Sequence, residues 1–181
     1  MATKKTDNVI YGREALEFVA VAAQYCAFLE GSEGCEKEEF ITTLLKLLPQ
    51  VYARALQLPR VECNGDFLCE EHVKEEDYDW ICATAQNIMQ DDDEYEEISM
   101  TDLGPEERRW HSVGEGLADV YQPLRNFVSV YQQRIEDCML EALWELMDNF
   151  ELYWGQALLD TLRRLHQLRY TIREGADEED L

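Results

Sequence analysis

Three side chains with metal-binding chemistry lie close together in one stretch of irregular sequence. Cys63, Cys69 and His72 are spaced as C-x5-C-x2-H between Pro59 and Val73, where hydrophobic residues show no periodicity. Thiolates and an imidazole in a loop are ligands that zinc binds well. A closed zinc site needs a fourth ligand, and no CxxC or HxxxH pair supplies one. Zinc is therefore a weak hypothesis beside the ordinary interpretation of these cysteines as loop thiols.

Two acidic rows at helical spacing offer further metal ligands. The rows are His111, Glu115 and Asp119, and Glu141, Glu145 and Asp148. Metal sites in helix bundles combine inward carboxylates with Glu-x-x-His motifs, and no such motif occurs on the predicted helices. We therefore interpret both rows as exposed acidic faces.

A glycine inside a strongly helical pattern is the third feature that could serve a function. Gly155 follows the aromatic pair Tyr153 and Trp154. Because glycine in a helix interior costs roughly 1 kcal/mol relative to alanine, we expect another helix, or the Trp154 indole, to approach the backbone here. The alternative is a small pocket between helices, walled by Tyr153 and Trp154. Its polar end would consist of Gln156, Arg163, Arg164 and His166.

Motifs for the common reaction classes are missing from this sequence. It contains no glycine-rich phosphate loop and no G-x-S-x-G nucleophile elbow, and no motif surrounds its three histidines. We therefore expect a protein that is not an enzyme and that uses no cofactor.

Five stretches with helical hydrophobic periodicity must position these side chains. In each stretch, apolar residues recur at spacings of three and four. The stretches are residues 13–29, 40–56, 75–90, 112–131 and 133–169, the last with a break near Asp148 or Asn149. They predict an all-α, single-domain bundle of about five helices with a long C-terminal helix.

Local signals around residue 112 refine this prediction. Ser112 and Glu115 match a capping box, in which the serine oxygen accepts from a backbone N–H and the glutamate reaches back. A helix should begin there, so His111 precedes it and need not align with Glu115. Upstream, residues 95–100 fit a short strand as well as polar coil, and no partner strand is evident.

The charge balance excludes two classes of partner. The chain has 16 Lys and Arg against 39 Asp and Glu, a formal net charge of -23. Nucleic acid and anionic membranes are bound through basic patches, so neither is an expected partner. The plainest interpretation of the acidic surface is solubility. The sharper interpretation is a docking face for a basic protein.

Domain boundaries and location follow from the ends of the chain and its cysteines. We predict a flexible N-terminus over residues 1–8, one helical domain over 9–172 and a disordered acidic tail over 173–181. No apolar signal segment follows Met1, and no run of about 18 apolar residues occurs. Six cysteines at irregular spacing favour free thiols in a reducing compartment, so we expect a cytoplasmic protein.

Several short segments form a pattern that extends over nearly the whole chain. They are residues 17–19, 47–59, 75–78, 117–121, 150–151 and 154–155, followed by Ala- and Leu-rich turns up to residues 165–166. The pattern resembles an uncharacterised bacterial family, domain of unknown function 5063. The resemblance implies a small, helical, cytoplasmic domain with no established activity, and hence no catalytic residue. The cysteine-bearing loop is not part of the pattern.

The sequence is compatible with two functions. The leading hypothesis is a non-enzymatic, acidic protein-interaction or regulatory module whose partner is another protein. The alternative is a small-molecule-binding or hydrolytic bundle with a pocket near Trp154 and His166. The residues proposed to bind a ligand or partner are Asp119, Tyr121, Tyr153, Trp154, Gln156, Arg164 and His166.

Overall fold

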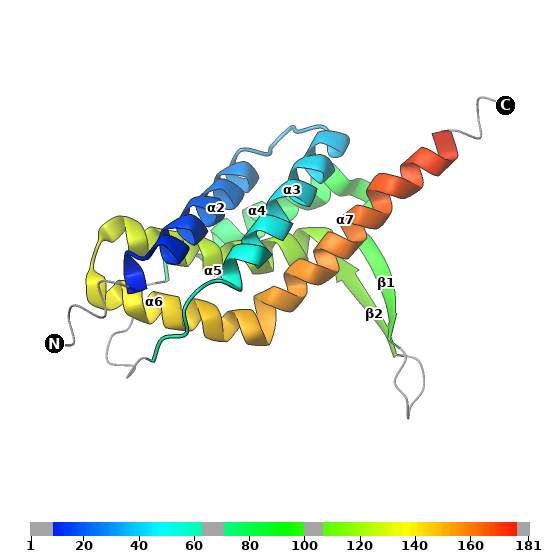
Figure 1. Cartoon of the computed structure of the whole chain (residues 1–181). Coiled ribbons are helices and arrows are strands. Elements are labelled where there is room, and N and C mark those ends of the chain that lie inside the picture. Colours follow the sequence, from blue (N-terminus) through cyan, green and yellow to red (C-terminus); the bar gives the residue numbers. More distant parts are fainter. Residues whose placement is uncertain (1–8, 63–70, 100–106, 177–181) are drawn as a thin grey trace.

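The computed structural model describes residues 9–62, 71–99 and 107–176, which form a helical bundle with a projecting β-hairpin (Figure 1). Its helices are α2 (Arg13–Glu30), α3 (Lys37–Ala55), α4 (Glu75–Met89), α5 (Val113–Gln133), α6 (Glu136–Asn149) and α7 (Gly155–Ala176). The predicted all-α bundle with a long C-terminal helix is confirmed. The predicted flexible N-terminus and the last five residues of the predicted tail lie outside the described residues.

Helix α5 is the central element of the bundle. It packs against α2, α4, α6 and α7, while α3 packs against α2 and α7. Two glycines allow the closest of these approaches. A Cβ at Gly114 would lie 2.8 Å from the carbonyl oxygen of Cys82 in α4, and one at Gly116 would lie 2.2 Å from the Thr161 hydroxyl in α7.

A small antiparallel hairpin corrects the prediction for residues 95–100. A 3-10 turn (Gln90–Asp92) follows α4, and β1 (Glu94–Ser99) then pairs with β2 (Glu107–Ser112). Residues 95–99 are therefore a strand with a partner, neither coil nor a lone strand. Sequence patterns missed β2 because its only large apolar residue is Trp110, so no alternation of apolar and polar residues marks it.

The start of α5 confirms the predicted N-cap at Ser112. The Ser112 hydroxyl accepts from the backbone N–H of Glu115 at 3.1 Å and donates to the buried Asp93 carboxylate at 2.6 Å. Asp93 also accepts the N–H of Gly114 at 2.8 Å. His111 accordingly lies on β2, where its ring stacks on Tyr95 with centroids 5.5 Å apart.

The C-terminal helical run contains a π-turn, η2 (Phe150–Trp154), between α6 and α7. The predicted break near Asp148 or Asn149 is confirmed, because α6 ends at Asn149. In the π-turn the backbone N–H of Gly155 donates to the carbonyl of Phe150. A Cβ at Gly155 would lie 2.5 Å from that carbonyl oxygen. The close approach predicted at Gly155 therefore comes from Phe150 in the preceding turn and not from another helix.

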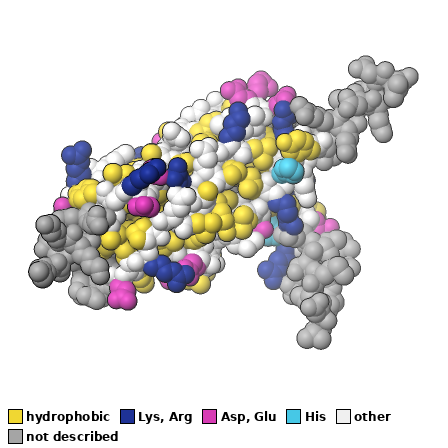
Figure 2. All heavy atoms as spheres, viewed as in Figure 1, with side chains coloured by type: hydrophobic (Ala, Val, Ile, Leu, Met, Phe, Trp, Pro, Cys, Tyr) yellow, Lys and Arg dark blue, Asp and Glu magenta, His cyan; other side chains and the backbone are white. Residues whose placement is uncertain are grey.

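Aromatic side chains join the two halves of the core. Phe18 of α2 lies 5.6 Å from Phe127 of α5 and 6.4 Å from Trp154, measured between ring centroids. Figure 2 shows that hydrophobic side chains also reach the surface in a band across the face formed by α3 and α7. In the described part of the chain, no helix has both the length and the apolar character needed to cross a membrane.

Candidate functional site

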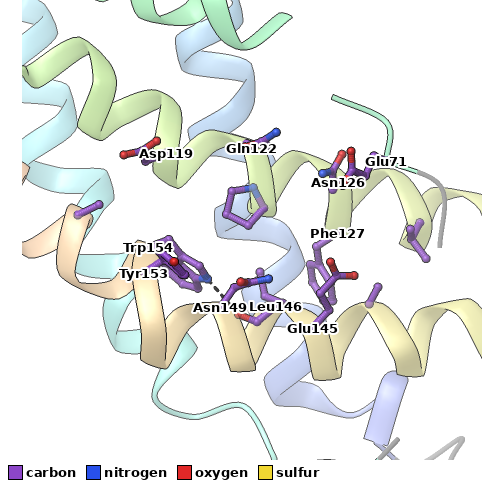
Figure 3. A pocket seen from close by; sticks show the side chains of 14 residues that line it. Glu71, Asp119, Gln122, Asn126, Phe127, Glu145, Leu146, Asn149, Tyr153 and Trp154 are labelled. Atoms are coloured by element: carbon purple, nitrogen blue, oxygen red, sulfur yellow. Dashed lines mark hydrogen bonds between the residues drawn. The ribbon is translucent and has the colours of Figure 1, made fainter. Parts of the chain in front are cut away.

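A pocket of about 510 Å³ separates α5 from α6 and the π-turn (Figure 3). This volume lies in the range of small-ligand pockets, about 300–1,000 Å³. One wall consists of Asp119, Gln122, Pro123, Asn126, Phe127 and Val130 of α5. The other consists of Ala142, Glu145, Leu146 and Asn149 of α6, Tyr153 and Trp154 of the π-turn, and Ala157 of α7. Glu71, which precedes α4, closes one side.

The bottom of the pocket is apolar. Phe127, Leu146 and Trp154 close it, and none of these side chains is more than 2% exposed. Pro123 and Ala157, which are half-buried, continue the apolar surface outward. An apolar group that entered the pocket would therefore meet carbon on several sides.

The rim of the pocket is acidic and rich in amides. Glu71, Asp119 and Glu145 contribute carboxylates, and all three are exposed. Gln122 and Asn149 add amides from opposite walls. No lysine or arginine is among the described residues that line this pocket. Its electrostatic field therefore favours a positively charged group.

Glu145 is the rim carboxylate with a perturbed pKa. Partial burial raises the pKa of Glu145 above its ordinary value, and the negative charges of Glu71 and Glu141 raise it further. A cation beside Glu145 would oppose both effects, since it stabilises the ionised carboxylate. Within the described ranges, the Glu145 side chain makes no hydrogen bond or ion pair, so it is available to a ligand.

The π-turn positions the two aromatic residues of the site. The Trp154 indole N–H donates to the carbonyl oxygen of Leu146 at 3.0 Å, which holds the ring at the bottom of the pocket. Tyr153, its neighbour in the chain, is 72% exposed at the rim. Widened helical turns of this kind are frequent at functional sites. Here the turn places the Tyr153 ring at the opening and the Trp154 ring in the core.

Asn126 fixes the segment that carries Glu71. Its side-chain oxygen accepts the backbone N–H groups of His72 and Val73, each at 2.8 Å. These two hydrogen bonds hold the segment before α4 against α5. Glu71 is thereby brought to the pocket, although it lies far from α5 and α6 in the sequence.

Asp119 has a defined orientation on the α5 wall. The Tyr78 hydroxyl of α4 donates to Asp119 Oδ1 at 2.8 Å. Burial and this hydrogen bond raise the pKa of Tyr78, so its hydroxyl stays protonated and continues to donate. Pro123 lacks a backbone N–H and so leaves the Asp119 carbonyl without its usual intrahelical donor. The Tyr78 hydrogen bond orients the Asp119 carboxylate and occupies one of its acceptor sites, whereas Pro123 leaves the Asp119 carbonyl with spare acceptor capacity.

Of the sequence-predicted binding residues, the structure brings Asp119, Tyr153 and Trp154 together at this pocket. Tyr121 faces a different hollow, where its hydroxyl donates to Glu30 at 2.9 Å. Gln156 donates to Asp160 at 2.8 Å on the exposed face of α7. These two side chains therefore do not join the other three.

Arg164 and His166 also lie away from the pocket. Arg164 donates to the Asp92 carbonyl at 3.2 Å, and its guanidinium lies 5.3 Å from the centre of the Tyr95 ring. His166 is exposed and packs against Tyr170, with ring centroids 4.6 Å apart. The predicted polar end is displaced because residue 166 lies twelve positions after residue 154, roughly 18 Å along a helix.

The predicted metal ligands do not converge within the part of the chain that the structure describes. Cys63 and Cys69 lie outside the described residues, and the His72 ring contacts Gln133 at 3.0 Å. No group of three or more His, Cys, Asp or Glu in residues 9–62, 71–99 and 107–176 could hold a metal ion.

The acidic row of α6 is not wholly exposed. The interpretation of Glu141 as an exposed residue is wrong, since it is only 7% exposed.

Sequence reasoning missed most of the α5 and α6 wall. Gln122 lies three positions after Asp119, and Asn126 lies four positions after Gln122. This spacing places all three on one side of α5. Glu145 and Asn149 share a face of α6 for the same reason. These spacings were visible in the sequence, but which helices would face each other was not.

Residues 9–171 match the family described as a domain of unknown function, DUF5063. The chain belongs to this family. It is also similar to the crystal structure of protein BF1032 from Bacteroides fragilis, a structural genomics target. The two sequences are 36% identical, the TM-score is 0.79, and the similarity covers 90% of this chain and 99% of that one. A comparison with curated proteins found no match.

Proposed function

We propose that this DUF5063 protein is a non-enzymatic cytoplasmic interaction module that binds a basic segment of a partner protein in the α5–α6 pocket. One observation carries the proposal: three carboxylates surround the opening of an apolar pocket that no lysine or arginine lines among the described residues. The net charge of -23 supports it, because a strongly negative protein attracts basic partners at long range.

The chemistry of the pocket argues for binding over catalysis. Hydrolysis by covalent catalysis needs a side-chain nucleophile with a base in hydrogen-bond reach. His166, the histidine proposed from the sequence, lies away from the pocket. The groups that do converge are carboxylates, amides and aromatic rings, which recognise a cation through charge, hydrogen bonds and ring faces.

Glu145→Gln should weaken binding of a basic peptide. The substitution removes one rim charge and keeps the shape of the side chain. For an exposed ion pair we expect about two- to fivefold weaker binding of a fluorescent tetra-arginine peptide, measured by anisotropy at low salt. The matched control is Asp148→Asn, which removes one charge from an exposed position of α6 outside the pocket. Equal effects of the two variants would contradict the assigned site.

The same peptide should bind more weakly as the pH is lowered through the raised pKa of Glu145. Protonation of Glu145 removes one of the negative charges that attract the peptide. The contribution of Glu145 to folding has the opposite sign: its raised pKa means that protonation favours the folded state, so this contribution grows as the pH falls. Peptide affinity, measured by anisotropy, and the free energy of unfolding, measured by denaturant titration, should therefore depend on pH differently in the native protein and in Glu145→Gln. If the native protein and Glu145→Gln had the same pH dependence in both affinity and stability, the role of Glu145 would be refuted.

A small amine is the second candidate ligand, favoured by the volume of the pocket. The charged group would occupy the same rim, and the organic part would fill the interior. A thermal-shift screen of small amines tests this function, because a ligand that binds only the folded state raises Tm in a concentration-dependent way.

A further inference from the structure

The pocket changes character from its opening to its interior, and this change specifies what a partner segment must contain. The following inference rests on the proposed function. At the rim, Glu71, Asp119 and Glu145 are exposed to solvent. At the bottom, Phe127 and Trp154 are almost completely buried. A ligand that carries charge alone would satisfy the rim and make no contact with the apolar lining of the pocket.

We propose that the pocket recognises an apolar side chain flanked by basic residues, the apolar group entering the pocket and the basic groups pairing at the rim. The interior offers no charged partner at its bottom, so a cation placed there would lose hydration without a compensating ion pair. An aliphatic or aromatic group loses no such hydration and gains contact with the half-buried Pro123 and Ala157, above the buried bottom of the pocket.

The positions of the polar groups agree with this division. Glu71, Asp119 and Glu145 come from three different elements, so they surround the opening instead of forming one row. Basic residues on both sides of an apolar residue could therefore each reach a carboxylate. Gln122 and Asn149, whose side chains make no hydrogen bond within the described ranges, can bind the peptide backbone or an arginine.

The ion pairs at the rim and the burial of the apolar side chain should respond differently to salt. Ion pairs at an exposed rim are screened as the Debye length falls from about 10 Å at 0.1 M to about 3 Å at 1 M salt. Burial of an apolar side chain does not depend on charge and persists at high salt. Salt dependence therefore separates the apolar contribution from the basic one in a single peptide series.

The test uses three acetylated and amidated five-residue peptides and the full chain. The first has arginine at both ends, glycine at positions two and four, and a central leucine. In the second the leucine is alanine, and in the third both arginines are citrulline, which is nearly isosteric but neutral. Binding is measured by calorimetry, and the Trp154 indole signal is followed by NMR after Trp80, Trp110 and Trp144, all exposed, have each been changed to phenylalanine for assignment.

We expect the first peptide to bind most tightly and to shift the Trp154 indole signal. The alanine peptide should bind about tenfold more weakly at both salt concentrations, because it loses the buried leucine. The citrulline peptide should bind more weakly only at low salt. Equal affinities of the leucine and alanine peptides would overturn this inference and leave the proposed function intact. Failure of all three peptides to bind at low salt would overturn the proposed function as well.

A variant that fills the pocket checks the location independently. Ala157→Leu places a larger apolar side chain at the lining of the pocket and changes no charge. It should reduce the affinity of the leucine peptide to that of the alanine peptide, while Ala53→Leu at an exposed position of α3 should have no effect. Unchanged affinity in a folded Ala157→Leu protein would overturn the inference. Phenylethylamine serves as a small-amine probe. If it bound as tightly as the leucine peptide, the inference of a peptide ligand would be overturned in favour of a free amine.

Discussion

Trp154→Ala should lower the free energy of unfolding by about 3–5 kcal/mol, the range for aromatic residues removed from a protein core. The Trp154 side chain is 1% exposed and packs against Phe18 and Phe150, the latter with ring centroids 4.5 Å apart. The substitution also removes the indole N–H that donates to Leu146. The loss comes from three contacts at once, because the ring joins α2, α6 and the π-turn.

Denaturant titration followed by circular dichroism measures this change, and Trp110→Ala is the matched control. Trp110 lies on β2 and is 71% exposed, so its replacement should change the free energy of unfolding by less than about 0.5 kcal/mol. A Trp154→Ala protein as stable as Trp110→Ala would show that the indole is not part of the core. In a chain of this size, each kcal/mol corresponds to about 2–4 °C in Tm, so thermal unfolding gives a second measurement.

Gly155→Ala should destabilise the protein by about 1–3 kcal/mol, although alanine is the better helix former at an ordinary position. The added Cβ would lie 2.5 Å from the Phe150 carbonyl oxygen and 2.9 Å from the Phe150 ring. The carbonyl is backbone and cannot rotate away, so the π-turn must shift. Tyr153 and Trp154 move with it, so peptide binding should weaken together with stability.

Gly31→Ala provides the control for that substitution. Gly31 ends α2, and its nearest neighbour to an added Cβ is the Ala27 carbonyl oxygen at 3.4 Å, an ordinary contact. Its replacement should leave the free energy of unfolding within about 0.5 kcal/mol of the native protein. If Gly155→Ala were equally neutral in stability and in peptide binding, close packing in the π-turn would not be what requires glycine.

These expectations separate the stability of the pocket from its ligand specificity. Trp154 and Gly155 hold the bottom of the site, so their substitution affects folding and binding together. Glu145 and Asp119 lie at the exposed rim, where substitution changes charge with little effect on packing. Rim variants are therefore the better choice for measuring recognition in an intact protein.

Local sequence determined several parts of the fold. The N-cap at Ser112 and the break at Asn149 follow from short-range hydrogen bonding and backbone geometry, which depend on residues a few positions apart. Gly155 was identified as a position of close approach for the same reason, although its partner proved to be Phe150 in the preceding turn. Periodicity likewise gave the helices, because one stripe of each must face the core.

Tertiary structure alone decided the binding site and the hairpin. Glu71, Asp119 and Glu145 meet because α5 packs against α6 and because Asn126 holds the segment before α4. Strand β2 exists because Glu94–Ser99 provides its partner, since its own sequence has little strand character. Sequence spacing fixes which face of a helix a residue occupies. It does not fix which other face that residue meets, since this depends on contacts between segments far apart in the chain.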